Sequence, residues 1–271
     1  MNVKTLAKRW LPPALLERLK PLFRRNIYFS GDYPDWKAAG AQSSGYNSAL
    51  ILERVKEAML RVTNGEAKFE RDSVPFDEVQ HSFPVLAGLL RAASESGNRL
   101  SVLDFGGSLG SSYFQCRDFL SVLLSLSWGI VEQRHFVDCG RELFETDQLR
   151  FFHTISECVE HTAPNVVLLS SVLQYVPDPY DVLDELMGTG ISYLVIDRTP
   201  FADQRADWIT IQHVPESIYN ASYPCRIFGR QVFLAKFRGR YDLIAQFDGS
   251  DGIATANGRA FNFSGMILRK A

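Results

Sequence analysis

The sequence lacks most features that mark specialised classes of protein. Its 271 residues include four cysteines, none of them in a CxxC pair, which argues against a zinc site or disulfide framework and favours reduced thiols. A formal net charge of −2 provides no basic surplus for nucleic acid. No internal repeat or low-complexity tract occurs. With 46% hydrophobic residues, the chain suits one soluble domain with an appendage, or two small domains.

The first 25 residues are locally basic. They hold a single acid, Glu17, among several lysines and arginines, and leucines recur there at helical spacing. Pro12, Pro13 and Arg18 interrupt the apolar run, so we expect neither a signal peptide nor a transmembrane span. A helix of this kind packs on its own domain or lies on an anionic membrane surface. The first is favoured; the second would add peripheral contact with the inner membrane to a cytoplasmic location.

Residues 1–97 are expected to form a helical N-terminal extension or cap. The stretch GDYPDWKAAGAQSSGYNS is rich in turn residues and predicts an ordered loop. An apolar stripe after Asn47 or Ser48 predicts a helix that ends at Asn64-Gly65. A second helix is predicted from about Ser82 to Ser96, with Pro84 in its first turn.

The pattern changes in residues 98–271, where strand-length apolar runs alternate with helical periodicity. This alternation predicts βαβ units and a parallel sheet, and the continuous runs indicate that both faces of the sheet are covered. Near the end, two apolar runs flank Asp-Gly and Asn-Gly turns, which predicts an antiparallel hairpin. The strand candidates are 101–105, 128–133, 149–153, 165–171, 192–197, 241–247 and 259–270, and the helix candidates are 111–126, 138–146 and 177–188.

The first strand candidate runs into a glycine-rich turn, VLDFGGSLGSS. A P-loop is excluded because no lysine follows Gly110. A GxGxxG fingerprint fits poorly, because Ser108 and Ser111 occupy the places of its second and third glycines. The pattern Asp-x-Gly-x-Gly-x-Gly fits at Asp104, Gly106 and Gly110, with Ser108 at the middle glycine. A purely structural tight turn is the alternative.

This pattern resembles the first motif of class I S-adenosylmethionine-dependent methyltransferases. Glu132 ends the second strand candidate, 26 residues after Gly106, where an acid can bind both hydroxyls of a ribose. NVVLLSSVLQYVPDP is similar to the fourth-strand segment of these enzymes. Nearly the whole chain further resembles a bacterial methyltransferase family, assigned from its fold and often associated with surface-polysaccharide gene clusters. That likeness rests on GDYPDWKAAGAQSSGYNS, ERDSV, VLDFGGSLGSSYFQ, VEQRHFV, LLSSVLQY, IDRTPF and IYNASYP.

The resemblance implies an α/β fold: a Rossmann-like, seven-stranded sheet with an antiparallel terminal hairpin. It implies S-adenosylmethionine as cofactor and O-methylation of a small or saccharide-linked acceptor. Glu132 would bind the ribose, and Gln133 would flank the adenine. The remaining cofactor-binding residues it implies are Asp104, Gly106, Gly107, Ser108, Gly110, Ser170 and Ser171.

The acceptor side is expected from the segment after the fifth strand candidate, IDRTPFADQRADWITIQHVPESIYNASYPC. His213 is a candidate general base or a surface histidine. Arg198 is a candidate for binding an anionic group, or it pairs with a nearby acid. The other candidate acceptor residues are Arg71, Asp72, Tyr113, Tyr219 and Tyr223.

No metal is expected, because Ser170-Ser171 stand at the end of the fourth strand candidate, where metal-dependent O-methyltransferases need carboxylates. The Asn/Asp-Pro-Pro-Tyr motif of enzymes that methylate nucleic-acid amino groups is absent as well. Two other functions stay open: a non-catalytic cofactor-binding module, and a nucleotide-dependent oxidoreductase or sugar-nucleotide enzyme on the same fold.

Overall fold

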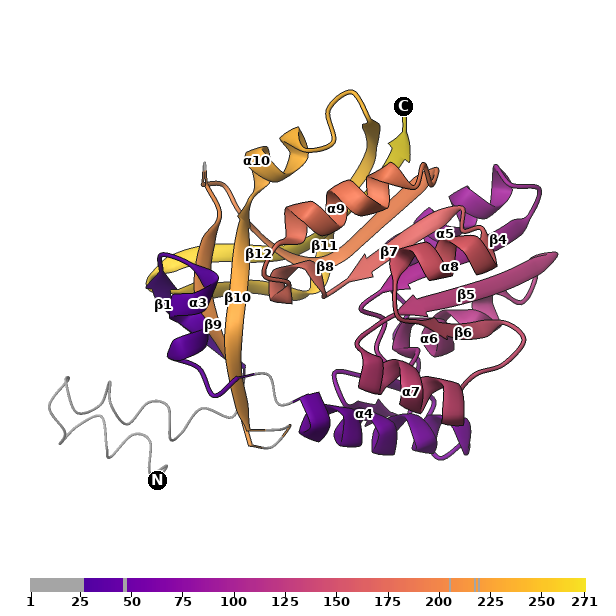
Figure 1. Ribbon diagram of the computed structural model, residues 1–271, viewed down its shortest axis with the longest axis horizontal. Helices are drawn as coiled ribbons and strands as arrows, with labels where there is room; N and C mark the ends of the chain where they lie inside the picture. The colour runs from indigo at the N-terminus through magenta and orange to yellow at the C-terminus, as the bar shows by residue number, and fades with distance from the viewer. Residues whose placement is uncertain (1–26, 46–47, 205, 217, 219) are drawn as a thin grey trace, which may run out of the picture.

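The computed structural model describes residues 27–45, 48–204, 206–216, 218 and 220–271. Residues 1–25, with their expected helix and membrane contact, lie outside this part, as do Asn47 and Tyr219. Figure 1 shows a twisted sheet with helices packed on it and with β1, β9 and β10 standing to one side.

Seven strands form the central sheet in the order β6-β5-β4-β7-β8-β12-β11. The pairs from β6 to β8 are parallel, whereas β12 runs antiparallel between β8 and β11. The α/β fold with an antiparallel terminal hairpin is therefore confirmed. The bounds are β4 Arg99–Phe105, β5 Ser125–Val131, β6 Leu149–Phe152, β7 Val166–Ser170, β8 Tyr193–Ala202, β11 Tyr241–Ala256 and β12 Arg259–Lys270.

Helices cover both faces of this sheet, because successive strand residues are apolar on both sides. Val102 packs in the core beneath α4, α5, α6 and α7, whereas its neighbour Leu103 packs in the core beneath α8, α9 and α10. Strand residues alternate between two faces, so each face acquires its own core. The bounds are α4 Ser48–Thr63, α5 Phe83–Ser94, α6 Ser111–Leu120, α7 Arg134–Leu143, α8 Ile155–Thr162, α9 Pro179–Gly188 and α10 Arg230–Ala235.

Three further strands extend the sheet beyond the end of β8. β10 (Ala221–Gly229) runs parallel to the end of β8 and antiparallel to β9 (Trp208–Val214), which pairs in turn with β1 (Tyr28–Tyr33). The segment expected to form the acceptor side, for which no strand was predicted, is thus mostly strand. The N-terminal region, predicted to be helical, also contains strands. It supplies β1 and the short hairpin of β2 (Phe69–Arg71) and β3 (Val74–Phe76), in addition to the short helix α3 (Trp36–Ala41).

Some predicted boundaries are wrong. The helix expected to reach residue 126 ends at Leu120, because Ser125 and Leu126 already belong to β5. The predicted loop at 248–258 is mostly strand, since β11 continues to Ala256, and only Asn257 and Gly258 make the turn, both with positive φ. An irregularity in the pairing between Asp248 and Ile253 explains why the alternation looks broken in the sequence.

Candidate functional site

A cavity of about 700 Å³ opens at the carboxyl ends of the central strands. Its floor includes the loop after β4, Glu132 after β5, Ser170 and Ser171 at the end of β7, and Arg198 on β8. β5 and β7 lie on opposite sides of β4, so the strand order reverses there. Ligands of open α/β sheets bind at such a switch point.

The glycine loop has a conformation that its sequence explains. Gly106 has a φ of +72°, and a Cβ there would lie 2.3 Å from Cγ2 of Val172. A Cβ on Gly107 would lie 2.6 Å from the carboxyl carbon of Asp104. Ser108 takes a φ of 56°, a left-handed conformation that glycine adopts without steric cost. The serine therefore retains the backbone shape of the glycine that it replaces. Gly110 caps α6 with a φ of 102°.

Asp104 lies buried beneath this loop. The indole Nε1 of Trp128 donates a hydrogen bond of 2.9 Å to its Oδ2. Burial raises the pKa of Asp104 to about 7, although the Trp128 hydrogen bond opposes the shift. The nearby carboxylate of Glu132 contributes in the same direction as burial.

Glu132 lines the cavity, and its binding of a ribose stays a prediction. It stands directly after β5 and lies in the cavity lining with Asp104 and the glycine loop. Its Oε2 accepts a hydrogen bond of 2.7 Å from the backbone N–H of Gln133. Burial raises the pKa of Glu132, while backbone donors at Gln133 and Ser108 lower it. The side chain of Gln133 is exposed at the start of α7 and is not part of the cavity lining.

Glu70 is a buried acid on the cavity that was not predicted from the sequence. It is 1% exposed, and it accepts hydrogen bonds from the hydroxyl of Ser111 and, at 2.6 Å, from the backbone N–H of Ser73. Burial raises the pKa of Glu70 to about 7 against these hydrogen bonds. Little in the sequence marks it, because Glu70 stands in the largely charged stretch AKFERDSV.

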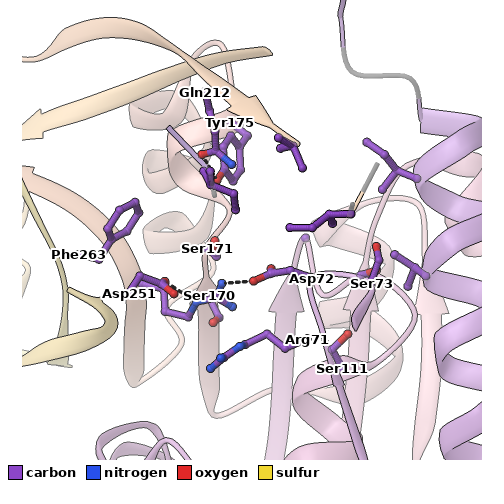
Figure 2. A pocket seen from close by; sticks show the side chains of 18 of the residues that line it. Arg71, Asp72, Ser73, Ser111, Ser170, Ser171, Tyr175, Gln212, Asp251 and Phe263 are labelled. Atoms are coloured by element: carbon purple, nitrogen blue, oxygen red, sulfur yellow. Dashed lines mark hydrogen bonds and ion pairs between the residues drawn. The ribbon is translucent and has the colours of Figure 1, made fainter. Parts of the chain in front are cut away.

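Arg198 forms ion pairs with two carboxylates. Its guanidinium lies 2.6 Å from Oδ2 of Asp72, in the turn between β2 and β3, and 2.8 Å from Oδ2 of Asp251 on β11. Dashed lines in Figure 2 lead from Asp72 and Asp251 to this shared partner. Burial disfavours the charge, but the two acids raise the pKa of Arg198 above its ordinary value. Of the two roles considered for Arg198, the structure shows the pairing with acids.

Backbone strain is concentrated around the cavity. In the described part of the chain, eight residues other than glycine have a positive φ. Five of them line the cavity, namely Asp72, Ser73, Ser108, Ser171 and Arg198. Strained residues of this kind gather at functional sites, where the surrounding structure holds them in place.

The part of the cavity that the 3-10 turn η2 (Leu173–Tyr175), β9 and β10 line is aromatic and uncharged. Tyr175 in η2 donates a hydrogen bond of 2.8 Å to Oε1 of Gln212 on β9. Nε2 of Gln212 donates to the hydroxyl of Tyr223 on β10 at 3.3 Å. Phe29 from β1 and Phe263 from β12 complete this wall, and Figure 2 shows Tyr175 and Gln212 together, across the cavity from Arg71.

Two residues predicted for the acceptor side, His213 and Tyr113, are not brought to the cavity. His213 lies between Gln212 and Val214, which both line the cavity, so strand alternation directs it to the other face. There its Nε2 lies 2.8 Å from the hydroxyl of Ser30, and its ring stacks on Tyr28. Tyr113 is buried in α6, and its hydroxyl donates to Gln148 at 3.2 Å.

The described residues lack two further features. No helix among them is both long and apolar enough to cross a membrane. Within the same residues, no group of three or more histidine, cysteine, aspartate and glutamate side chains is placed to hold a metal ion.

No family model matches the sequence, and no curated protein matches it. Several solved structures are similar to this chain at low identity. The N-terminal domain of EvdMO1, crystallised with SAH and D-fucose, is 14% identical with a TM-score of 0.48, covering 83% of this chain and 97% of that domain. The [4+2]-cyclase SpnF is 12% identical with a TM-score of 0.47, covering 88% and 97%. CalS10, an amino pentose methyltransferase from Micromonospora echinaspora crystallised with SAM, is 11% identical with a TM-score of 0.43, covering 70% and 91%. Likenesses this weak support neither a ligand nor a reaction for this chain.

Proposed function

We propose that the chain is an S-adenosylmethionine-dependent methyltransferase that methylates a hydroxyl of a small or saccharide-linked acceptor. One observation carries the proposal: the glycine loop and Glu132 line one cavity at the switch point of the sheet. Gly107 supports it, because the Asp104 carboxylate behind this residue leaves no room for a Cβ, so the loop presents bare backbone here. The backbone of this loop can therefore approach a ligand closely.

The residues present fit an adenosyl cofactor. Glu132 can accept hydrogen bonds from two adjacent ribose hydroxyls, and it is oriented by backbone donors at Gln133 and Ser108. S-adenosylmethionine would supply a methyl group activated by its sulfonium. The protein's part is to hold the acceptor oxygen in line with that methyl, at about 3 Å, and to exclude water.

The acceptor belongs on the aromatic side of the cavity in this proposal. Tyr175, Gln212 and Tyr223 are linked through hydrogen bonds, which fixes a wall of hydroxyl and amide groups between apolar rings. Such a wall suits an uncharged ring that bears hydroxyls. Because Arg198 is neutralised by Asp72 and Asp251, it is not assigned to an anionic acceptor group.

Isothermal titration calorimetry with S-adenosylhomocysteine and with NAD tests the cofactor. We expect S-adenosylhomocysteine to bind, NAD not to bind, and Glu132→Ala to weaken S-adenosylhomocysteine at least tenfold. Asp147→Ala is the control, because Asp147 is an exposed acid outside the cavity. Binding of NAD instead would favour the oxidoreductase or sugar-nucleotide alternative.

Turnover is tested by incubating the protein with labelled S-adenosylmethionine and a panel of glycosyl and phenolic acceptors. Transfer of label to a glycosyl acceptor supports the proposal as stated, whereas transfer to a phenol alone overturns the saccharide assignment. Tight cofactor binding with no transfer to any acceptor would favour a non-catalytic binding module.

A further inference from the structure

A second cavity of about 300 Å³ adjoins the first. It lies among the hairpin β2–β3, the first residues of α5 and α6, and the irregular part of β11. Both cavities share a border made of Glu70, Arg71, Ser111, Ser112, Ser170 and Arg198. The site therefore continues past the glycine loop into a chamber that the proposed adenosine and acceptor positions leave unused.

Arg71 is the cation at this border that has no carboxylate partner among the described residues. Its nearest polar partner is Oε1 of Gln80 at 3.5 Å, and its guanidinium lies 5.6 Å from the centre of the Phe76 ring. Within the described part of the chain it forms no ion pair with a carboxylate, unlike Arg198. Figure 2 shows the Arg71 side chain extending from the hairpin, away from Tyr175 and Gln212.

Glu70, its neighbour in the chain, is an acid without a cation in contact. Its hydrogen-bond donors, the Ser111 hydroxyl and the Ser73 N–H, are both uncharged. A fully buried carboxylate is costly unless a cation compensates it, and burial raises the pKa of Glu70 to about 7. A positively charged ligand group at this position would restore the ionised form.

Glu70 and Arg71 thus give the border an acid and a cation from adjacent positions in the chain, and no ion pair joins the two. A ligand group with a single charge would satisfy one of them and leave the other unpaired. A group that carries an ammonium and a carboxylate on one carbon would satisfy both. The chemistry of the border therefore matches an α-amino acid.

We propose that the junction of the two cavities binds the α-amino-acid end of the cofactor, with its ammonium at Glu70 and its carboxylate at Arg71. This inference rests on the proposed function. It agrees with the chain path, because Ser111, which donates to Glu70, directly follows Gly110 at the end of the glycine loop. The second cavity then accommodates the part of the cofactor that lies beyond the sulfur atom.

Calorimetry with two ligands tests this assignment. S-adenosylhomocysteine carries the amino-acid end, whereas 5′-methylthioadenosine has the same nucleoside and sulfur without it. We expect the unmodified protein to bind S-adenosylhomocysteine more tightly than methylthioadenosine. Arg71→Gln and Glu70→Gln should each weaken S-adenosylhomocysteine at least tenfold, equivalent to about 1.4 kcal/mol, and change methylthioadenosine less than twofold.

The controls separate this inference from the proposed function. Lys68→Gln removes an exposed cation from the same hairpin region and should change neither affinity, while Arg71→Lys should recover part of the S-adenosylhomocysteine affinity. Equal losses for both ligands in Arg71→Gln, or no loss for either, would overturn the inference and leave the function intact. If the unmodified protein binds neither ligand, the proposed function fails, and the inference fails with it.

Discussion

Trp128 holds Asp104 from the neighbouring strand through a hydrogen bond of 2.9 Å between Nε1 and Oδ2. The carboxylate occupies the space behind Gly107, so this pair supports the glycine loop from below. The loop's shape therefore depends on a buried aromatic residue two positions before the partner of Asp104 in the register of β5.

Trp128→Phe is expected to lower the free energy of unfolding by about 1–3 kcal/mol at pH 8, because it removes the donor to a buried carboxylate. The loss should be smaller at pH 5, where Asp104 is protonated, given its pKa of about 7. Urea unfolding at the two pH values measures the difference. Tyr113→Phe, in contact with Trp128, is the control and should show no such pH dependence.

The stability of the whole protein should fall as the pH rises from about 4 to about 7. Glu70 and Asp104 have pKa values of about 7 in the folded protein, against 4.5 and 3.8 ordinarily. In that window the folded state retains protons that the unfolded chain has released, so stability present at low pH is lost on raising the pH.

Each of these two groups contributes a slope of up to about 1.4 kcal/mol per pH unit. Glu70→Gln and Asp104→Asn should each flatten the dependence of unfolding free energy on pH, and the double variant should flatten it further. Unchanged slopes in both single variants would contradict the raised pKa values.

Ser108→Gly should stabilise the protein by up to about 1 kcal/mol, because a left-handed conformation costs about 1–2 kcal/mol for a residue with a Cβ. The gain is reduced by the greater freedom of glycine in the unfolded chain. Gly106→Ala should instead destabilise it by about 2 kcal/mol and weaken S-adenosylhomocysteine, because its Cβ would meet Val172.

Thermal unfolding measures both changes in the loop. Gly188→Ala in α9 is the matched control, since nothing lies within 4 Å of its added Cβ and its φ is not positive. It should be neutral or stabilising. A destabilised Ser108→Gly protein would show that the serine side chain makes an essential contact.

Asp72→Asn should release the β2–β3 hairpin without disrupting its turn, because asparagine tolerates the left-handed conformation at that position. Loss of the ion pair with Arg198 should speed amide hydrogen exchange in residues 69–76, by an amount equivalent to about 1 kcal/mol at low salt. The effect should shrink in concentrated salt. Arg259→Gln, which breaks an ion pair with Asp32 elsewhere, should leave the hairpin unaffected.

The central sheet could be predicted because its signals are local. Continuous apolar runs such as residues 166–169 are buried on both faces, and the Asn257-Gly258 turn is encoded in two residues. The loop and Glu132 could be placed on one side of the sheet for the same reason: the carboxyl ends of parallel strands meet at one edge.

The remainder depends on contacts between distant segments. β1 pairs with β9 across some 180 residues, as in the contact of Ser30 with His213, so no strand was predicted on the acceptor side. Once that segment is a strand, alternation directs Gln212 into the cavity and His213 away from it. Glu70 was not predicted because β2, with only three residues, is too short to show a strand pattern. Its place in the site depends on a contact with Ser111, which lies 41 residues away in the sequence.

The pairing of β1 with β9 bears on how the chain can be shortened. A protein that begins at residue 98, at the predicted boundary of the main domain, would lose β1 and present the backbone donors and acceptors of β9 to solvent. An uncovered strand edge of that kind is a template for self-association. Removing residues 1–97 would therefore expose an association-prone strand edge, and it would also remove the hairpin that carries Glu70 and Arg71.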